Sequence, residues 1–412
     1  MSESSPRAKR DIASSALASV EQARAAMLAG IRPLAPEPVA LDEALGRVLA
    51  APVLAVRDQP PFTASMMDGY ALNAAGTPAR LKVIGEAAAG RGFSGHCGVG
   101  QAVRISTGAP LPEGSDTVVM QEDVKRDGDF VEVPAFQPGQ NVRPRGLDFV
   151  AGAQLLGKGL RLDGIALALA AASGAATVSV TRRPLVSILT GGDELAEPGS
   201  QPGPFQIFDS ATRGLGALVK AWGGEAQRLS LEKDDEAAIA RAAQGALTGS
   251  DLLVVIGGAS VGDHDHARPA LMRLGLELAV DKVALRPGKP CWFGRTPQGP
   301  VLGLPGNPAS ALVCAHLFLR PMLAAMLGAD ATVVLRRAHL SEALPANGPR
   351  EHYLRARLSS DDVGRLSARA FEQQDSSLLS VFASANALIR LKPNAPASAA
   401  GDLVDVLLLD GA

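Results

Sequence analysis

The spacing of apolar residues changes several times along the 412-residue chain. Residues 16–29, ALASVEQARAAMLA, carry apolar side chains at helical spacing, and Gly30 marks the end of this predicted helix. Residues 41–50, LDEALGRVLA, show the same spacing and predict a second amphipathic helix. The longest Ala-rich apolar stretch, residues 165–180, predicts a buried helix that runs into a strand.

Further along, the pattern predicts strands. Between about residues 60 and 150, short bursts of alternating residues such as LKVIGEAAAG and DTVVMQEDV predict a β-rich insertion. From residue 184, continuous apolar strands such as DLLVVIGG alternate with Gly-rich loops and helical patterns, which predicts a parallel sheet covered by helices. The C-terminal segments YLRARL, ALIRLKP and DLVDVLLL predict a small β-barrel or sandwich. The chain is therefore expected to be an α/β multidomain protein.

The amino-acid composition limits the classes of binding partner and the kinds of site to be expected. Lys and Arg together number 40 against 42 Asp and Glu, so the formal net charge of −2 gives no global attraction to nucleic acid or an anionic membrane. Cys97, Cys291 and Cys314 form no CxxC pair, which favours small buried side chains over a disulfide framework or a thiolate zinc site. Residues 1–15 are polar, and no run reaches the roughly 18 apolar residues of a spanning helix. We expect a cytoplasmic protein.

Acidic residues follow three predicted strands. They are Asp193, Glu194, Asp234, Asp235, Asp263 and Asp265. The carboxyl ends of parallel strands lie at one sheet edge, so these carboxylates repel one another unless a hard cation or a substrate proton lies between them. His264 and His266 alternate with the last two, which leaves a transition-metal site open as an alternative. A magnesium site held by carboxylates fits better. In an extended segment neighbouring side chains point to opposite faces, so adjacent Asp and His side chains would not meet at one transition-metal ion.

Two short motifs indicate an anion site. RPGKP at 286–290 places Arg286 and Lys289 on either side of a rigid Pro-Gly step. In PGNPAS, Asn307 can cap a helix with Pro308 at its first position, which leaves backbone N–H groups that bind phosphate or another oxyanion. A plain capped helix explains PGNPAS equally well.

Seven segments occur together in an order typical of one family. They are SMMDGYAL at 65–72, RISTGAPLPEGSDTVVMQED at 104–123, RPRGLDF at 143–149, TGGDEL, GGASVGDHD, RPGKP and GLPGNPASA. This set resembles the molybdopterin molybdenumtransferases, the MoeA-type molybdenum insertases, which are similar to the E domain of gephyrin. The likeness covers nearly the whole chain after about residue 15.

The resemblance implies a set of domains. We expect an elongated linking and dimerisation domain, a β-rich inserted domain, a MogA-like α/β domain that binds molybdopterin, and a C-terminal β-barrel. Their expected limits are 11–58 with 150–183, 59–149, 184–330 and 331–412, in that order.

The resemblance also implies a reaction. Such an enzyme inserts molybdate into adenylylated molybdopterin and releases AMP with the help of Mg2+. It acts as a homodimer whose site is shared between subunits, and a molybdopterin adenylyltransferase is a further partner to consider. Two alternatives stay open: a non-catalytic scaffold on the same fold, and another nucleotide phosphotransfer enzyme, although the sequence has no P-loop.

Site residues are carried over by position from the family motifs. The catalytic residues implied are Asp68, Thr107, Asp148, Glu194 and Asp265. Those implied for binding the molybdopterin substrate are Asp68, Tyr70, Thr107, Gly258, Ser260, Pro305, Asn307 and Pro308. Those implied for molybdate are Arg286, Lys289, Pro290, Arg355 and Ser376. Those implied for the metal are Glu194, Asp234 or Asp235, and Asp265.

The chain departs from the family pattern at several of these motifs. Arg286 stands where many relatives have Lys, which replaces a point charge by a planar fork. Thr63 stands where Asp or Asn is common, and Leu147 replaces an acidic residue. Asp375 precedes Ser376 where Gly is usual, and a carboxylate beside an oxyanion site weakens binding unless it points away.

Overall fold

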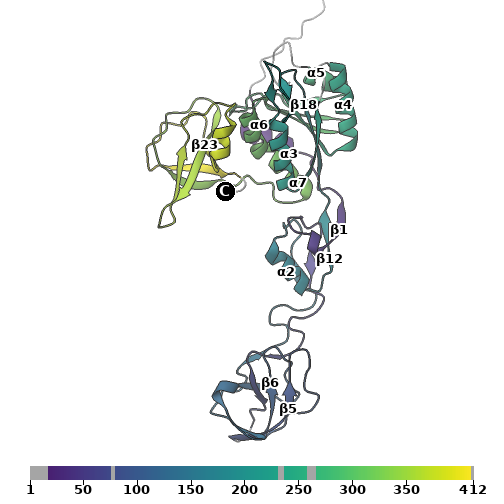
Figure 1. The fold of residues 1–412 in the computed structure, drawn as a ribbon, viewed down its shortest axis with the longest axis vertical. Helices are drawn as coiled ribbons and strands as arrows, with labels where there is room; N and C mark the ends of the chain where they lie inside the picture. The colour runs from purple at the N-terminus through teal and green to yellow at the C-terminus, as the bar shows by residue number, and fades with distance from the viewer. Residues whose placement is uncertain (1–16, 76–78, 231–235, 258–265, 410–412) are drawn as a thin grey trace, which may run out of the picture. The chain divides into compact units, whose positions relative to one another are not determined.

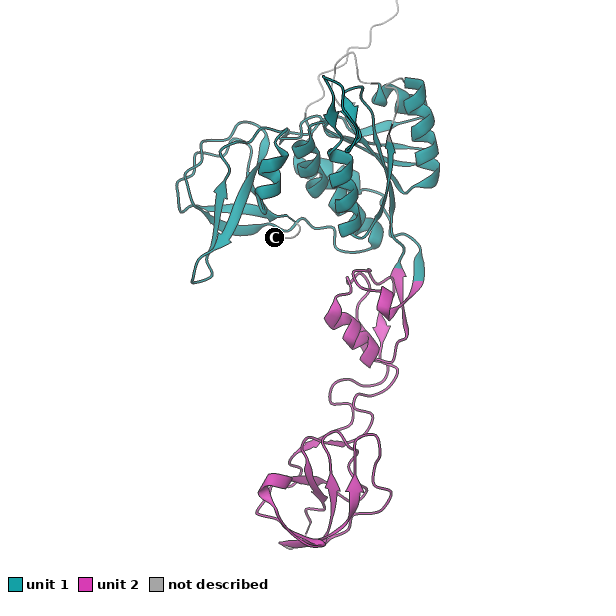
Figure 2. Cartoon of the chain, viewed as in Figure 1, with its two compact units in different colours: residues 1–37, 181–412 teal, residues 38–180 magenta. Residues whose placement is uncertain are grey.

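The computed structural model describes most of the chain, namely residues 17–75, 79–230, 236–257 and 266–409. The chain divides into two compact units, which Figure 2 shows in different colours. The first comprises residues 1–37 and 181–412, and the second comprises residues 38–180.

A six-stranded sheet forms the centre of the first unit. Its order is β16 (Glu225–Ser230), β13 (Leu185–Thr190), β17 (Leu252–Ile256), β21 (Gly299–Leu304), β20 (Trp292–Thr296) and β18 (Glu277–Val280). The first four strands are parallel, as predicted, but β20 and β18 pair antiparallel. The predicted parallel sheet thus continues into two antiparallel strands on this side, because β20 and β21 are joined by a short turn that permits only antiparallel pairing.

Helices cover both faces of this sheet (Figure 1). One face carries α1 (Val20–Leu28), α3 (Ala211–Ala221), α6 (Pro308–Cys314) and α7 (Arg320–Leu327), and the other carries α4 (Glu236–Gly249) and α5 (Ala267–Arg273). In β17, Leu252, Val254 and Ile256 pack into the first core. Leu253 and Val255 pack into the second. Successive side chains point to opposite faces, so a strand buried on both sides is apolar throughout.

The segment Pro308–Leu327 is a long apolar helical segment of the first unit. It combines α6, the π-helical turn Ala315–Leu319 and α7. By length and composition it could cross a membrane, but 78% of its apolar window is buried inside the protein, as in a core helix. Contrary to the prediction from the sequence, residues 165–180 are therefore not the longest such stretch, because Pro308–Leu327 is longer although His316 and Arg320 interrupt its apolar pattern.

Five strands of the first unit close into a barrel, which confirms the predicted C-terminal β-barrel. They are β22 (Arg336–Leu340), β23 (Glu351–Ser360), β24 (Leu366–Ala370), β25 (Ala387–Leu391) and β26 (Leu403–Leu408). The order runs β23, β24, β22, β26, β25, and β25 pairs back onto β23. Ala356, Ala368, Ile389 and Val406 fill the barrel core. The two-residue strand β19 (Leu285–Arg286) adds to β23 from outside the barrel.

The second unit contains the predicted β-rich insertion. A six-stranded sheet has the order β7 (Thr117–Met120), β4 (Gly69–Leu72), β6 (Gln101–Ile105), β5 (Arg80–Ala87), β9 (Phe130–Glu132) and β8 (Lys125–Asp127). Two further short strands, β3 (Ala64–Ser65) and β10 (Val142–Arg143), pair with each other.

The remainder of the second unit corrects two helix predictions. Residues 41–50 form only a 3-10 turn, Leu41–Glu43, because Gly46 has φ +73° and the following residues bridge to other strands. The helix α2 (Gly164–Ala172) exists, but it is not buried, since Ile165 is 81% exposed. Next to α2, β1 (Pro36–Ala40) pairs with β12 (Thr177–Thr181), and β2 (Val53–Leu54) pairs with β11 (Gln154–Leu156).

Candidate functional site

A cavity of about 760 Å³ lies at the carboxyl ends of three adjacent parallel strands. Thr190, Ile256 and Pro305, at the ends of β13, β17 and β21, form part of its wall. Ligands of open α/β sheets bind at this edge. The start of α3, the start of α6 and the segment at Ser377 complete the lining.

The cavity gathers several residues that the sequence predicted. Glu194, Pro290, Pro305, Asn307 and Pro308 all line it. They come from three separate loops, and the fold therefore brings RPGKP, GGDEL and LPGNP to one place. Neighbouring walls come from the paired short strands β14 (Leu195–Ala196) and β15 (Ile207–Phe208).

Asn307 connects the start of α6 to the C-terminal segment. It occupies the predicted N-cap position, with Pro308 at the first helical position. Its side chain does not cap the helix, however: Nδ2 donates to Oγ of Ser376 at 2.8 Å. The backbone carbonyl of Ser376 accepts from the N–H of Ala309 at 3.1 Å. The predicted side-chain cap was therefore wrong, because Ser376 satisfies this helix end instead.

Arg355 is a buried cation, only 1% exposed, next to this segment. Its Nη1 donates to the carbonyl oxygen of Asp375 at 2.9 Å, and its Nε donates to Oε1 of Gln374 at 3.2 Å. Among the described residues, no acceptor pairs with the buried Nη2. Burial lowers the pKa of Arg355, against the opposing effect of Asp375. A buried donor without a partner is unfavourable in the free protein, so Nη2 is suited to an oxygen of a bound anion.

The Asp375 carboxylate is engaged within its own turn. Its Oδ1 accepts from the backbone N–H of Ser377 at 2.9 Å and from the hydroxyl at 2.6 Å. These two bonds hold the pKa of Asp375 below its usual range. The unusual acidic residue therefore presents its carbonyl oxygen to Arg355, while its carboxylate is bound by Ser377.

Arg286 and Lys289, the cations of RPGKP, are both exposed. Arg286 pairs with His352 in the parallel register of β19 and β23, so the two side chains share one face of the sheet. Arg355 lies three positions further along β23, and its side chain therefore leaves the opposite face. Burial, reinforced by Arg286, Arg350 and Arg355, lowers the pKa of His352 to about 4. The structure thus places Arg286 beside a neutral His352.

Asp68 and Thr107 meet in the inserted sheet of the second unit. Oδ1 of Asp68 accepts from the Thr107 N–H at 2.6 Å and from its hydroxyl at 3.0 Å. Both bonds lower the pKa of Asp68. Tyr70, two residues on, is only 5% exposed and packs in the core with Leu72 and Val119, so most of its ring serves the fold.

Asp148 lies on an exposed loop after β10. Its N–H donates to the carbonyl of Gln59 at 2.9 Å, which leaves the carboxylate at the surface. Leu147 beside it is 58% exposed. The carbonyl of Thr63 accepts from Leu111 at 2.9 Å.

Most predicted metal ligands fall outside the described residues, as do two predicted substrate-binding residues. These positions are Asp234, Asp235, Gly258, Ser260, Asp263 and Asp265. Within the described part of the chain, no group of three or more His, Cys, Asp or Glu side chains could hold a metal ion. Glu194 is the predicted ligand that the structure does place, at the cavity wall.

Asp209 and Ser210 also line the cavity, although neither was among the site residues predicted from the sequence. Asp209 is 7% exposed, and its carboxylate accepts from both the N–H and the hydroxyl of Thr212 in the first turn of α3. The signal was present in FDSAT, since Asp followed by Ser directly before a helical pattern is typical of a helix start.

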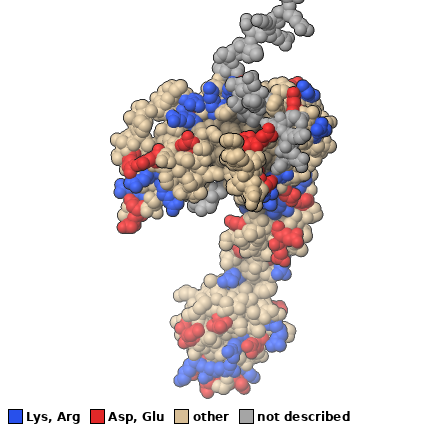
Figure 3. Space-filling model, turned by 45° about the horizontal axis from the view of Figure 1, so that its top comes forward, with Lys and Arg blue, Asp and Glu red and all other residues tan. Residues whose placement is uncertain are grey.

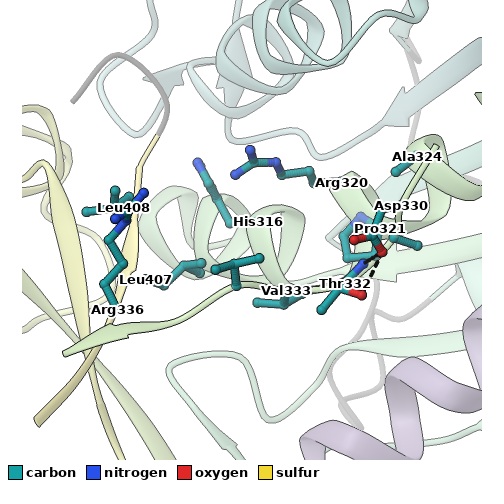
Figure 4. Close-up of a pocket in the computed structure, with 12 residues that line it drawn as sticks. His316, Arg320, Pro321, Ala324, Asp330, Thr332, Val333, Arg336, Leu407 and Leu408 are labelled. Atoms are coloured by element: carbon teal, nitrogen blue, oxygen red, sulfur yellow. Dashed lines mark hydrogen bonds between the residues drawn. The ribbon is translucent and has the colours of Figure 1, made fainter. Parts of the chain in front are cut away.

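A second cavity of about 340 Å³ lies elsewhere in the first unit (Figure 4). His316 and Arg320 form one wall, and Asp330, Thr332 and Arg336 belong to the segment that leads into the barrel. Oδ1 of Asp330 accepts from the N–H and the hydroxyl of Thr332 at 2.9 and 2.6 Å. None of the predicted site residues lines this cavity among those described, so the first cavity is the candidate site.

Charge is distributed in small groups on the surface. On the face in Figure 3, basic and acidic side chains are interspersed. This agrees with the near-neutral composition, and it means that an anion is recognised by a local arrangement of cations.

Comparison with known families gives the class of protein. Three families match in succession: MoeA N-terminal region (domain I and II) at residues 18–174, probable molybdopterin binding domain at 187–325, and MoeA C-terminal region (domain IV) at 337–409. The fold is therefore that of a MoeA-like protein.

Curated relatives and a solved structure agree. A molybdopterin molybdenumtransferase from Nostoc sp. is 38% identical over 333 residues, which cover 77% of this chain and 76% of the relative. That of Haemophilus influenzae is 33% identical over 405 residues and covers 94% and 97%. A crystal structure of a molybdopterin biosynthesis MoeA protein from Pyrococcus horikoshii matches with a TM-score of 0.84 at 31% identity, covering 96% of this chain and all of the other.

The chain belongs to the molybdopterin molybdenumtransferase family. The resemblance read from the seven motifs is thus confirmed, and so is the predicted class of enzyme, a transferase of molybdenum cofactor biosynthesis.

Proposed function

We propose that this protein inserts molybdate into adenylylated molybdopterin, releases AMP and so yields the molybdenum cofactor. One observation carries the proposal beyond family membership. The cavity at the sheet edge is lined by Glu194, Pro290 and Asn307, and Asn307 is bonded to Ser376, which follows the Asp375 carbonyl that binds Arg355. A carboxylate therefore lies on the cavity wall, and a buried cation lies behind the segment that contributes Ser377 to that wall.

The anion end of the site is assigned to molybdate. We propose that Arg286, Lys289, Pro290, Arg355 and Ser376 hold this tetrahedral dianion. The unpaired Nη2 of Arg355 supports the assignment, because charge-assisted hydrogen bonds to an oxyanion are short and strong. Lys289 is exposed and free of the core, so it can approach the anion as a point charge.

The nucleotide end is assigned to the acidic loops. Glu194 offers carboxylate oxygens, the donor type that Mg2+ prefers, and Asp265 with Asp234 or Asp235 follows the neighbouring strands β17 and β16 in sequence. When bound, the ion would neutralise charge on the phosphoanhydride. Gly258, Ser260, Pro305 and Pro308 are proposed to position the pterin, with the start of α6 directed at its phosphate.

A homodimer would complete the site. We propose that Asp68, Tyr70, Thr107 and Asp148 act on the substrate bound by a second copy of the chain. Large apolar side chains of the second unit support association, because burying them is favourable. The most exposed are Ile165 at 81%, Val56 at 72% and Leu45 at 64%. Sedimentation of a fully active monomer would refute this part.

The remaining proposals follow from the family. The compartment is the cytoplasm, a molybdopterin adenylyltransferase supplies the substrate, and the domain limits are 11–58 with 150–183, 59–149, 184–330 and 331–412.

The test is a reconstitution. Purified protein is mixed with adenylylated molybdopterin, molybdate and Mg2+, and AMP and pterin-bound molybdenum are measured together. We expect AMP release that depends on molybdate, with one molybdenum bound per AMP. Substrate binding without AMP release would favour a scaffold protein, and AMP release that ignores molybdate would favour another phosphotransfer enzyme.

A further inference from the structure

Two cysteines lie together beneath the RPGKP loop. Cys291 and Cys314 are both 0% exposed and belong to the same core. Both bond one acceptor, the carbonyl of Gly288: the Cys291 N–H donates to it at 3.0 Å, and Sγ of Cys314 lies 4.0 Å from it. Burial first, and then the neighbouring Cys291 thiol, raises the pKa of Cys314. Both are free cysteines, so they form no disulfide in this structure.

These cysteines belong to the two elements that build the candidate site. Cys291 directly follows the loop of Lys289 and Pro290. Cys314 is the last residue of α6, whose first residue, Pro308, lines the cavity. The loop touches the helix tightly here, since a Cβ on Gly288 would lie 2.5 Å from Sγ of Cys314.

We propose that Cys291 and Cys314 form a dithiol that closes reversibly into a disulfide and thereby changes the position of the RPGKP loop. Each thiol gives up one hydrogen, and the pair gives up two electrons to the oxidant. With hydrogen peroxide as the oxidant, the products are the disulfide and two molecules of water. With diamide, the N=N bond takes both hydrogens and becomes a hydrazine.

The bond requires the loop to move. A disulfide holds its sulfurs about 2.05 Å apart, much closer than two thiols in van der Waals or hydrogen-bond contact. Cys314 cannot shift easily, because Val313 and Ala315 beside it are also 0% exposed in a packed helix. Arg286 and Lys289 are exposed, so the loop that bears them takes up the displacement.

Burial makes the dithiol slow to react, which suits a device that responds to sustained oxidation. It raises the pKa of Cys314 well above the usual value, so the attacking thiolate is rare at neutral pH. Cys97 provides an internal comparison in the other unit. It is buried as well, and its Sγ lies 3.7 and 3.6 Å from the carbonyls of Ala71 and Gln101, with no second cysteine near it in the sequence.

The first experiment tests the bond itself and is independent of the proposed function. The full-length protein is incubated with diamide, denatured, alkylated and digested, and the peptides are identified by mass spectrometry. We expect a peptide that joins Cys291 to Cys314, an alkylated Cys97, and recovery of all three thiols after dithiothreitol. Cys291→Ala and Cys314→Ala should each abolish the cross-link, whereas the matched control Cys97→Ala should keep it.

The second experiment tests the consequence and rests on the proposed function. Molybdate binding is measured by equilibrium dialysis on reduced and oxidised protein, and we expect about a fivefold or larger weakening that dithiothreitol reverses, as for the loss of one hydrogen bond. Unchanged affinity in fully cross-linked protein would refute the movement of the loop. Three free thiols after prolonged diamide treatment, or a mixed disulfide with added glutathione, would overturn the proposal even if the protein proves to be an active molybdenumtransferase.

Discussion

Asn307 donates from Nδ2 to Oγ of Ser376 at 2.8 Å, and this bond joins the start of a sheet-edge helix to the segment that precedes α8 (Leu379–Ser384). The residue before Ser376 accepts from the buried Arg355 through its carbonyl. The α/β part and the barrel part of the first unit are therefore connected at the cavity. A change in the turn at residues 374–377 should alter the affinity for an anion bound there.

The first prediction concerns Asp375, the unusual acidic residue of that turn. Ser377→Ala removes one of the two hydrogen bonds that hold Oδ1 of Asp375, which loosens the carboxylate so that it can approach Arg355 and compete with the anion. We expect molybdate affinity to fall about tenfold, the magnitude of one charge-assisted interaction.

The matching control is the double variant Ser377→Ala with Asp375→Gly. If the free carboxylate is the cause, the second change restores affinity, and a double-mutant cycle measures a clear coupling between the two positions. Additive effects, with no rescue, would show that Asp375 does not influence the anion.

The second prediction concerns Gly288. It has φ +122°, and an added Cβ would meet Sγ of Cys314 at 2.5 Å and a Leu285 methyl carbon at 2.8 Å. Gly288→Ala should therefore lower the free energy of unfolding by about 1–3 kcal/mol and weaken molybdate binding through the displaced loop. Denaturant titration and dialysis measure the two effects. Gly348→Ala, at an open position with ordinary φ, should leave both nearly unchanged.

The elements that the sequence predicted well are those in which local pattern and tertiary packing agree. LLVVI in β17 is apolar throughout because both of its faces are buried. The alternation of apolar and polar residues in the inserted domain correctly predicted that it is rich in strands, and the C-terminal strands close into a barrel as expected. The motifs RPGKP and LPGNP likewise meet at one cavity.

The failures came where tertiary contacts override local preference. Residues 41–50 have helical spacing, but Gly46 adopts positive φ and Leu45 is exposed. Asn307 could have capped α6 by itself, yet Ser376, distant in sequence, takes its amide. Whether Arg286 and Arg355 lie on the same face of the sheet depends on how β19 and β23 align. That alignment pairs two segments distant in sequence, so neither segment alone predicts it.

The third prediction concerns acid stability. The pKa of His352 is about 4 in the folded protein, below the ordinary value of 6.5, chiefly because of burial. Between these values the unfolded chain binds a proton that the folded protein refuses. The stability that depends on a neutral His352 is therefore fully present above about pH 6.5. It falls as the pH drops toward 4, by at most about 1.4 kcal/mol per pH unit.

Chemical denaturation at about pH 7.5 and pH 5 checks this expectation. Between pH 6.5 and pH 5 we expect His352 to lower the free energy of unfolding by about 2 kcal/mol. His352→Gln cannot titrate and should lose this part of the pH dependence. An equal pH dependence in both proteins would mean that His352 is not responsible.

The last prediction concerns the division of labour between the cations of RPGKP. Arg286 shares a sheet face with His352, whereas the Arg355 side chain leaves the opposite face. Lys289 directly precedes Pro290, which lines the cavity. Lys289→Ala deletes one charge-assisted contact, so the molybdate affinity should fall about ten- to a hundredfold while adenylylated molybdopterin still binds. Excess molybdate should partly restore insertion. Arg286→Lys keeps the charge at the edge of the site and should have a small effect. Titration of molybdate against AMP release separates these outcomes: if Lys289→Ala instead weakens binding of the nucleotide and leaves the molybdate dependence intact, the loop belongs to the phosphate end of the site.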